Sequence, residues 1–310
     1  MKHCHLIVSV LLSAVTGSAQ TALFDWRGTS PGDNLGAAAC SPGDLNGDGI
    51  GDVVLRELTG VGVFALKARS GFDGSPLWAS PAYQSLTDLY RAGDVDGDGV
   101  GDMVARAGNP GPGNYLLPAV MFSGQDGSVI WVAMPFGLAP LDMRPKGAGY
   151  DYDGDGVPDV LVEAAANAFI GTFYAVVISG ADGSLLTYMP VASSGFGIAY
   201  RAFYLPDISG DGLAEFAVAY VIGSTVSFYG APGATLRLTK SQTNPSGVAL
   251  RFGSFVGTPG DVDFDGIAEF AISRQPDSSF GAVVPPPETA FYFGGSYASL
   301  GLIGFGTIGA

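Results

Sequence analysis

Asp44-Leu45-Asn46-Gly47-Asp48-Gly49-Ile50-Gly51-Asp52 is the first of five acidic loops that recur along the 310-residue chain. The other four begin at Asp94, Asp151, Asp207 and Asp261. Each loop places an oxygen-bearing side chain at positions 1, 3, 5 and 9 and a glycine at position 6. Hard cations such as Ca²⁺ take about six to eight oxygen ligands, and a sharp glycine turn lets these side chains point at one centre. The pattern therefore predicts five calcium-binding loops.

The predicted ligands are the side chains at positions 1, 3, 5 and 9 and the main-chain carbonyl at position 7. Loop by loop they are Asp44, Asn46, Asp48, Ile50 and Asp52; Asp94, Asp96, Asp98, Val100 and Asp102; Asp151, Asp153, Asp155, Val157 and Asp159; Asp207, Ser209, Asp211, Leu213 and Glu215; and Asp261, Asp263, Asp265, Ile267 and Glu269. Asn46 and Ser209 each replace one carboxylate. Because affinity follows ligand charge, the fourth loop is predicted to bind most weakly.

The loops share their first six positions with the EF-hand but differ from it afterwards. An EF-hand requires a carboxylate at position 12 and a helix on each side. Here position 12 is apolar in every loop and lies in a short run typical of a β-strand. These residues are Leu55, Ala105, Val162, Val218 and Ile272. A solvated acidic turn without a metal is the alternative interpretation, and five copies in phase with a repeat disfavour it.

A second motif, Ser-Gly-x-Asp-Gly-Ser, follows the acidic loops by about half of the repeat length. It occupies residues 70–75, 123–128 and 179–184, and degenerate forms occupy residues 229–233 and 293–296. Asp-Gly between two apolar runs predicts a hairpin, so Asp73, Asp126 and Asp182 are interpreted as turn residues. The loop starts lie 50, 57, 56 and 54 residues apart. Tandem four-stranded antiparallel units of this length predict an all-β fold, a single β-propeller with five blades.

These loops, with the apolar strands that follow them, resemble the FG-GAP/VCBS repeats of integrin α-subunit-like β-propellers. The resemblance covers residues 22–310. It implies that each loop joins the first two strands of a blade and that its metal is structural. Propellers of this family commonly have seven blades, whereas this chain has five loops. Residues 22–27 are predicted to supply the fourth strand of the last blade and so to close the ring, with Tyr297–Ile308 as the alternative.

Residues 1–19 have the features of a cleaved signal peptide: Lys2, an apolar run over 6–15, and a small residue, Ala19, before the expected cut. The propeller is predicted over residues 20–310, in a secreted or extracytoplasmic protein without a membrane span. The chain's two histidines fall within the signal peptide, which excludes histidine-based catalysis and histidine-ligated zinc in the mature chain. Cys40 is then the single remaining cysteine and is interpreted as a buried thiol.

The formal net charge of −15 is explained mainly by the loops, which hold 18 of the 29 acidic residues. Bound calcium would neutralise much of this charge. The chain has no basic run of the kind that binds nucleic acid, so no nucleic-acid partner is expected.

Two groups of residues outside the loops are candidates for function. Arg91, Arg144, Arg201 and Arg251 fall in predicted first strands. They are expected either to line a central channel that attracts an anion or, as the favoured interpretation, to pair with nearby carboxylates. Exposed tyrosines can stack on sugars or anchor proteins, but most aromatics of a propeller pack between blades. The tyrosines concerned are Tyr83, Tyr90, Tyr150, Tyr200 and Tyr204.

The sequence predicts a monomeric, calcium-stabilised module that binds or adheres to an extracellular protein or glycan, with about five structural Ca²⁺ ions. One alternative is a structural repeat protein of the cell envelope. Another is a glycan-active hydrolase, which needs two carboxylates flanking the scissile bond. The only acids outside the loops and turns that suit this role are Glu57, Asp88, Asp142 and Glu163.

Overall fold

The computed structural model describes residues 26, 35–109, 117–133, 142–165, 173–191, 200–220, 224–241, 250–276, 288–292, 294–296 and 298–304. The predicted signal peptide lies outside these residues. All the regular elements within them are β-strands, which form antiparallel sheets of four strands each. No helix that is long and apolar enough to cross a membrane occurs in this part of the chain.

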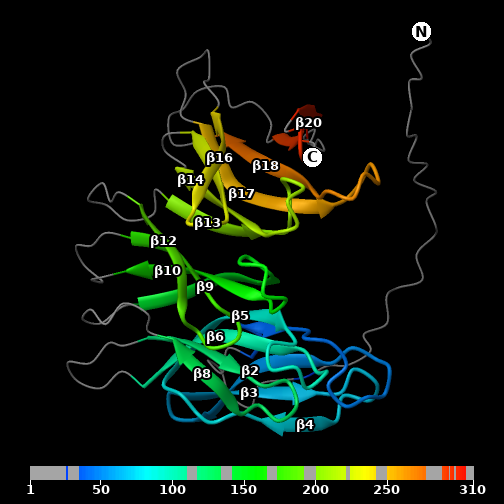
Figure 1. Cartoon of the computed structure of the whole chain (residues 1–310). Helices are drawn as coiled ribbons and strands as arrows, with labels where there is room; N and C mark the ends of the chain where they lie inside the picture. The colour runs from blue at the N-terminus through cyan, green and yellow to red at the C-terminus, as the bar shows by residue number, and fades with distance from the viewer. Residues whose placement is uncertain are drawn as a thin grey trace, which may run out of the picture.

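Five such sheets follow one another along the chain, and in each the strands lie in sequence order (Figure 1). The first contains β1 (Ala39–Cys40), β2 (Val53–Gly60), β3 (Val63–Arg69) and β4 (Pro76–Ala79). The second contains β5 (Ser85–Gly93), β6 (Asp102–Gly108), β7 (Ala119–Phe122) and β8 (Val129–Ala133). The third contains β9 (Asp142–Tyr150), β10 (Asp159–Ala165), β11 (Phe173–Ile178) and β12 (Leu185–Val191). The fourth contains β13 (Tyr200–Leu205), β14 (Glu215–Tyr220), β15 (Thr225–Gly230) and β16 (Thr235–Ser241). The fifth contains β17 (Leu250–Gly260), β18 (Glu269–Pro276), β19 (Glu288–Tyr292) and β20 (Ser299–Gly304).

Each acidic loop joins the first and second strands of a sheet, as predicted. Position 9 opens the second strand in four sheets and immediately precedes β2 in the first. The second strands of the three inner sheets, β6, β10 and β14, are largely apolar because a neighbouring sheet covers each face. In β10, Val160 packs against the second sheet, whereas Leu161 packs against the fourth. A strand buried on both faces needs no polar side, which explains the short apolar runs after the loops.

Four hydrophobic cores fill the spaces between consecutive sheets. Position 2 of each of the first four loops contributes to the core shared with the following sheet. These position-2 residues are Leu45, Val95, Tyr152 and Ile208, which are at most 8% exposed. The first strands β1, β5, β9, β13 and β17 contact one another in turn along one side of the stack. The sheets therefore pack face to face in sequence order, and each of the first four contacts the next partly through the position-2 side chain of its own loop.

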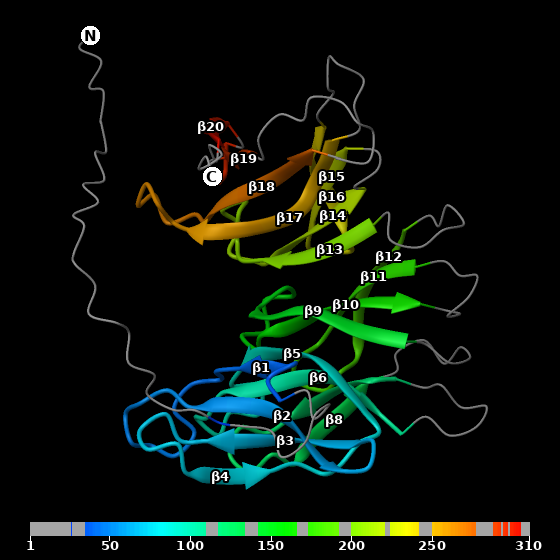
Figure 2. The same cartoon turned by 180° about the vertical axis from the view of Figure 1, so that it is seen from behind.

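The sheets form an open arc in both views, with the first and fifth sheets at opposite ends (Figures 1 and 2). The predicted closure by residues 22–27 is wrong, because β20 is the fourth strand of the fifth sheet. The alternative, a strand from Tyr297–Ile308, is the one observed. Of residues 22–27 only Trp26 is described; it lies outside any strand, under the guanidinium of Arg69 in the first sheet.

Candidate metal centres

The carboxylate at position 1 organises the backbone of each loop. In the first loop, Asp44 accepts N–H bonds from Gly47 at 2.7 Å and from Gly49 at 2.6 Å. Asp94, Asp151 and Asp207 accept the equivalent pairs of bonds. These bonds, led by that from Gly49, hold the pKa of Asp44 below its usual value. The turn that Asp44 organises thus favours the ionised form of this carboxylate.

Position 5 fixes the second half of the turn. Asp48 accepts the N–H of Ile50 at 2.8 Å through Oδ1, which leaves Oδ2 without a bond to this turn. Asp98, Asp155, Asp211 and Asp265 accept the position-7 N–H in the same way. Because each turn uses one oxygen of the carboxylate, the other oxygen is available for a further partner.

Position 9 is the most buried member of each loop. Asp52, Asp102, Asp159 and Glu269 are 0% exposed and Glu215 is 1% exposed. One oxygen of each accepts the N–H of position 2 in the same loop; in the third loop, Tyr152 donates to Asp159 at 2.7 Å. An ionised carboxylate at such a depth is stable only with strong compensation.

The second oxygen of position 9 separates the five sheets into two kinds. In the first three sheets it accepts the N–H of the hairpin glycine, Gly71, Gly124 or Gly180, at 2.8 to 3.0 Å. In the fourth and fifth sheets position 9 is a glutamate, and Oε1 of Glu215 and of Glu269 has no hydrogen-bond partner among the described residues. Those two buried oxygens are the atoms that most need a cation.

The hairpin glycines approach the loops very closely. A Cβ on Gly180 would lie 1.8 Å from the carbonyl oxygen of Pro158, so no other residue fits there without a backbone shift. Gly71 and Gly124 make the same approach to position 8 of their own loops. The strand register places Ala231 at this point in the fourth sheet. The sequence motif identified the hairpins, but it did not reveal that their first glycine is hydrogen-bonded to the acidic loop.

The turn acids have the structural role that was predicted. Asp73, Asp126 and Asp182 accept the N–H of the serine two residues later at 2.8 to 2.9 Å. They lie on the exposed side of the hairpin and contact no acidic loop through these bonds.

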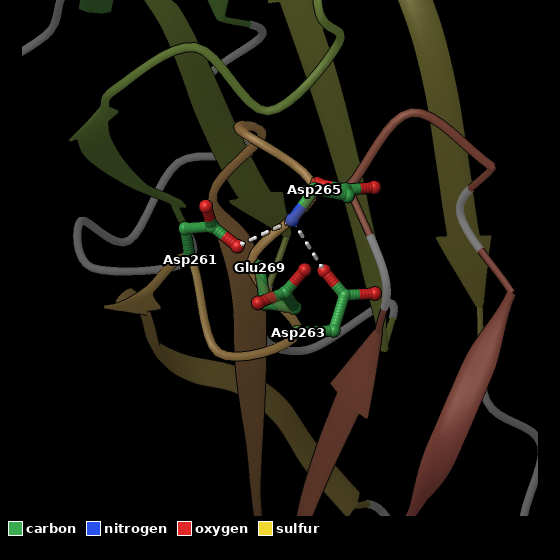
Figure 3. Close-up of side chains that lie close together, drawn as sticks. All are labelled: Asp261, Asp263, Asp265 and Glu269. Atoms are coloured by element: carbon green, nitrogen blue, oxygen red, sulfur yellow. Dashed lines mark hydrogen bonds between the residues drawn. The ribbon is translucent and has the colours of Figure 1, made fainter.

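Four of the loops bring acidic ligand atoms together within 4.8 Å of one another. Figure 3 shows the fullest group, in which the carboxylate of Glu269 lies between Asp261, Asp263 and Asp265. Three acids gather in each of the other loops: Asp94, Asp96 and Asp102; Asp151, Asp153 and Asp159; and Asp207, Asp211 and Glu215. Asp98 and Asp155 lie outside these groups, and the three acids of the first loop, Asp44, Asp48 and Asp52, do not form one. Every donor is an oxygen, which suits a hard cation such as Ca²⁺ and disfavours zinc.

Three of the buried position-9 acids have raised pKa values. Burial raises the pKa of Asp102 to about 6 and that of Asp159 to about 7, and neighbouring loop carboxylates raise both pKa values further. Burial likewise raises the pKa of Glu215 to about 7, with Asp211 and Asp207 adding to the effect. The N–H donors to these groups act in the opposite direction. A bound cation would favour the ionised form of each.

The four acids considered for hydrolysis are engaged in other contacts. Glu57 pairs with Lys67 at 2.9 Å and with Arg69 at 3.2 Å, and Glu163 pairs with Lys146 at 3.2 Å. Asp142 binds the guanidinium groups of both Arg106 and Arg144, and Asp88 accepts the hydroxyl of Thr87. The partners of Glu57 and Glu163 were not identified from the sequence because they lie on adjacent strands and depend on register, whereas the pairing of an arginine with Asp142 was expected.

Of the predicted arginines, Arg144 has the expected carboxylate partner. Arg144 is bound to Asp142, Arg201 donates to the carbonyl of Ser254 at 3.2 Å, and Arg91 is exposed beside Cys40. The backbone of Arg251 lies in β17, but its side chain is outside the described set. Cys40 is half-buried, and burial raises the pKa of its thiol to about 12, with the charge of Arg91 opposing this, which disfavours the reactive thiolate.

The predicted tyrosines pack mainly between sheets. Tyr83 meets Phe122 edge to face, and Tyr204 meets Tyr150 in the same way. Tyr90 borders the core between the second and third sheets. Tyr200 is different, because it stacks on Tyr220 at 4.7 Å and lines a cavity of about 250 Å³ between the third and fourth sheets.

No protein-family model and no curated protein matches the chain. Its fold is similar to several solved structures. A Bacteroides caccae protein of unknown function is 13% identical, with a TM-score of 0.42 over 77% of this chain and 69% of that chain. The Dos1 propeller is 9% identical, with a TM-score of 0.45 over 87% and 58%. The periplasmic gluconolactonase PpgL of Pseudomonas aeruginosa is 10% identical, with a TM-score of 0.40 over 82% and 69%. At these values none of the three assigns a function to this chain.

Proposed function

We propose that the acidic loops hold structural Ca²⁺ and that the chain is a secreted, calcium-dependent β-propeller module that binds an extracellular protein or glycan. The observation that carries the calcium proposal is the carboxylate of Glu269. It is 0% exposed, its Oε1 has no hydrogen-bond partner among the described residues, and three aspartates lie within 4.8 Å of it. Four carboxylates in such a group repel one another, and a bound cation would relieve that repulsion.

Calcium would supply charge neutralisation and would join the loop to the start of the second strand. The residues suited to hold it in the fifth loop are Asp261, Asp263, Asp265 and Glu269, with the carbonyl of Ile267 at position 7. Flexible all-oxygen sites favour Ca²⁺ over Mg²⁺, which demands a smaller octahedron and keeps its water. Export by a signal peptide would deliver the protein to a compartment where calcium is abundant.

A binding role suits the chain better than hydrolysis. Three of the four candidate catalytic acids are held in ion pairs, so none of these three is a free general acid or base. The acidic loops serve the scaffold rather than a reaction, since their deepest ligand anchors the hairpin in the first three sheets. Function would therefore reside on surfaces that the scaffold presents.

Closure of the five sheets into a ring is the finer architecture that we propose. Val262, at position 2 of the fifth loop, is 50% exposed, whereas its four counterparts are buried by the following sheet. Phe264 in the same loop is 90% exposed, and Ile50 of the first loop is 40% exposed. A fifth interface with the first sheet would cover Val262 as its counterparts are covered.

Ring closure is tested with cysteines at Ile50 and Phe264 in a Cys40→Ser background. A disulfide formed within the monomer on oxidation supports the ring. A disulfide that forms only between chains would refute it.

Calcium binding is tested by thermal unfolding with and without EDTA. Removing a ligand present at about 100 times its Kd lowers stability by about 2.7 kcal/mol per site, so the melting temperature should fall by several degrees. Glu269→Gln should reduce this difference, whereas Asp126→Asn, which alters a turn acid, should leave it intact. A melting curve that EDTA does not change would eliminate structural calcium.

The binding role is tested by probing arrays of extracellular-matrix proteins and of glycans with the purified chain. Binding that needs calcium supports the proposal. A folded, calcium-loaded protein that binds neither array would favour the envelope-structural alternative.

A further inference from the structure

The fourth loop differs from the other loops in carrying a cationic side chain. Nη2 of Arg237 lies 2.5 Å from Oδ2 of Asp211, the position-5 ligand, and 2.7 Å from the carbonyl oxygen of Ala231. In the other loops position 5 is Asp48, Asp98, Asp155 or Asp265, and among the described residues none of these has an ion pair. The oxygen that is free to face a metal elsewhere is therefore occupied in the fourth loop.

Arg237 stands where the other sheets have an apolar residue. Gly230 follows Tyr229 in the strand register of the fourth sheet, and Arg237 lies seven positions after Gly230. At the same spacing from Ser70, Ser123 and Ser179 the sequence has an apolar side chain: Leu77, Ile130 and Leu186. The side chain of Arg237 is 29% exposed, and that of Asp211 is 34% exposed. The pair is thus shielded from water enough to be stronger than an open surface ion pair.

Gly230 provides the space that the guanidinium needs. A Cβ at this residue would lie 2.7 Å from Nε of Arg237 and 3.3 Å from Oε1 of Glu215. The serine found at the equivalent place in the first three sheets would collide with Arg237. The same geometry shows that the guanidinium and the unpaired oxygen of Glu215 face one small space, so the positive charge lies beside both acids.

The fourth loop has also lost a ligand charge. Position 3 is Ser209, whereas the other loops have Asp or Asn there. Three changes thus coincide in one repeat: a weaker ligand at position 3, a glycine that opens space, and an arginine that enters it. All three changes bear on the same small region, and together they bring the positive charge of Arg237 to a loop that has lost a ligand charge.

We infer that Arg237 is the built-in cation of the fourth loop, so that this loop folds without Ca²⁺ and the chain binds four ions rather than five. The inference rests on the proposed calcium binding of the other loops. Asp207 and Asp211 then shape the turn without ligating a metal. Asp207 accepts the N–H of Gly212, and Asp211 accepts the N–H of Leu213.

The decisive measurement is the number of calcium ions per chain, obtained by equilibrium dialysis and elemental analysis. Four ions are expected for the wild type. Ser209→Asp combined with Arg237→Leu, the residue type of the other sheets, should raise the number to five. Arg201→Leu removes the same charge away from every loop and should leave it at four. Five ions in the wild type would overturn the inference, whereas none in any variant would overturn the proposed calcium binding instead.

Hydrogen exchange provides a second test that needs no new variant. In EDTA the amides of Gly210 and Gly212 should stay as protected as in calcium, because Arg237 still neutralises their loop. The corresponding amides of Gly97 and Gly99 in the second loop should exchange at least tenfold faster in EDTA. Equal acceleration in both loops would contradict a metal-independent fourth loop. Arg237→Leu should abolish the protection of the fourth loop in EDTA. The double variant Ser209→Asp/Arg237→Leu should regain that protection in calcium, and both results together would support the inference.

Discussion

The backbone N–H of Ala214 donates to the carbonyl oxygen of Asp151 at 2.7 Å, so position 8 of the fourth loop is hydrogen-bonded directly to position 1 of the third. Ala268 makes the same bond to Asp207 at 3.2 Å between the fifth and fourth loops. The third, fourth and fifth loops are therefore joined in series by direct backbone hydrogen bonds.

Side chains reinforce this connection at the glycine of position 4. A Cβ on Gly210 would lie 2.7 Å from Cδ1 of Ile267 in the next loop, and φ of Gly210 is +84°. We expect Gly210→Ala to destabilise the fold by about 2 to 3 kcal/mol, through backbone strain together with the collision. Gly97→Ala is the matched control, because Gly97 has φ +78° but nothing within 4 Å of its Cβ position. Urea unfolding should show a cost of only about 1 kcal/mol for the control. Equal costs would mean that Ile267 moves aside freely.

The hairpin glycine should be the least replaceable residue of the second sheet. A Cβ on Gly124 would lie 2.1 Å from the carbonyl oxygen of Gly101, and its N–H donates to the buried Asp102 at 2.9 Å. Gly124→Ala forces the backbone apart and removes a bond to a buried acid, so we expect a loss of about 3 kcal/mol or more. Gln125→Ala, at the adjacent exposed residue, should change stability by less than about 0.5 kcal/mol. Chemical denaturation of both variants in saturating calcium distinguishes these outcomes.

The calcium-free chain should lose stability as the pH rises. The pKa values of Asp102 and Asp159 are raised by burial to about 6 and about 7, so the folded chain binds protons that the unfolded chain has released. The stability gained from this proton binding is complete below about pH 4 and disappears as the pH passes 7. Each unit by which a pKa is raised corresponds to about 1.4 kcal/mol of unfolding free energy. This conversion sets an upper limit on the stability that each group contributes.

Unfolding in EDTA between pH 4.5 and 7.5 measures this dependence. Asp159→Asn should flatten it, because the amide does not titrate. Asp73→Asn should not flatten the pH dependence, because the hydrogen bond from Ser75 lowers the pKa of this exposed turn acid. A calcium-free stability that climbs with pH over this range would show that the position-9 acids are ionised without a metal.

Two tryptophans bind the following sheet in the same way but at different depths. Nε1 of Trp131 donates to the carbonyl oxygen of Gly180 at 2.6 Å, and Nε1 of Trp78 donates to that of Gly124 at 2.8 Å. Trp131 is 8% exposed, whereas Trp78 is half-buried. Replacement by Phe should cost about 2 kcal/mol at Trp131 and about 1 kcal/mol at Trp78, since water can replace the lost donor only at the latter. A reversed order in thermal unfolding would contradict this reasoning.

The local features of the fold were predictable because each depends on residues close together in the sequence. The acidic loops, the strands that leave them and the turn role of Asp126 follow from spacing and residue type alone. Contacts that depend on register were not predictable. Arg237 is 26 residues from Asp211, and nothing in the sequence between them indicates that β16 brings the two together.

The identity of the closing strand also depended on register and could not be predicted from the sequence. Residues 22–27 and the C-terminal stretch both have strand-like composition, and only the pairing of β19 with β20 decides between them. The carboxylates Glu57 and Glu163 were treated as free acids because their lysine partners, Lys67 and Lys146, lie on adjacent strands. Composition identifies such residues as charged, and strand register then determines whether they are available for chemistry.

The position-2 side chains give the stack a direction. Leu45, Val95, Tyr152 and Ile208 each leave their own loop to fill the core shared with the next sheet, never the previous one. Position 7 acts in the opposite direction, because Val100, Val157 and Leu213 pack against the core shared with the preceding sheet. Each inner loop thus contributes one side chain to each of two neighbouring cores, so damage at the third loop should loosen the interfaces on both sides of the third sheet.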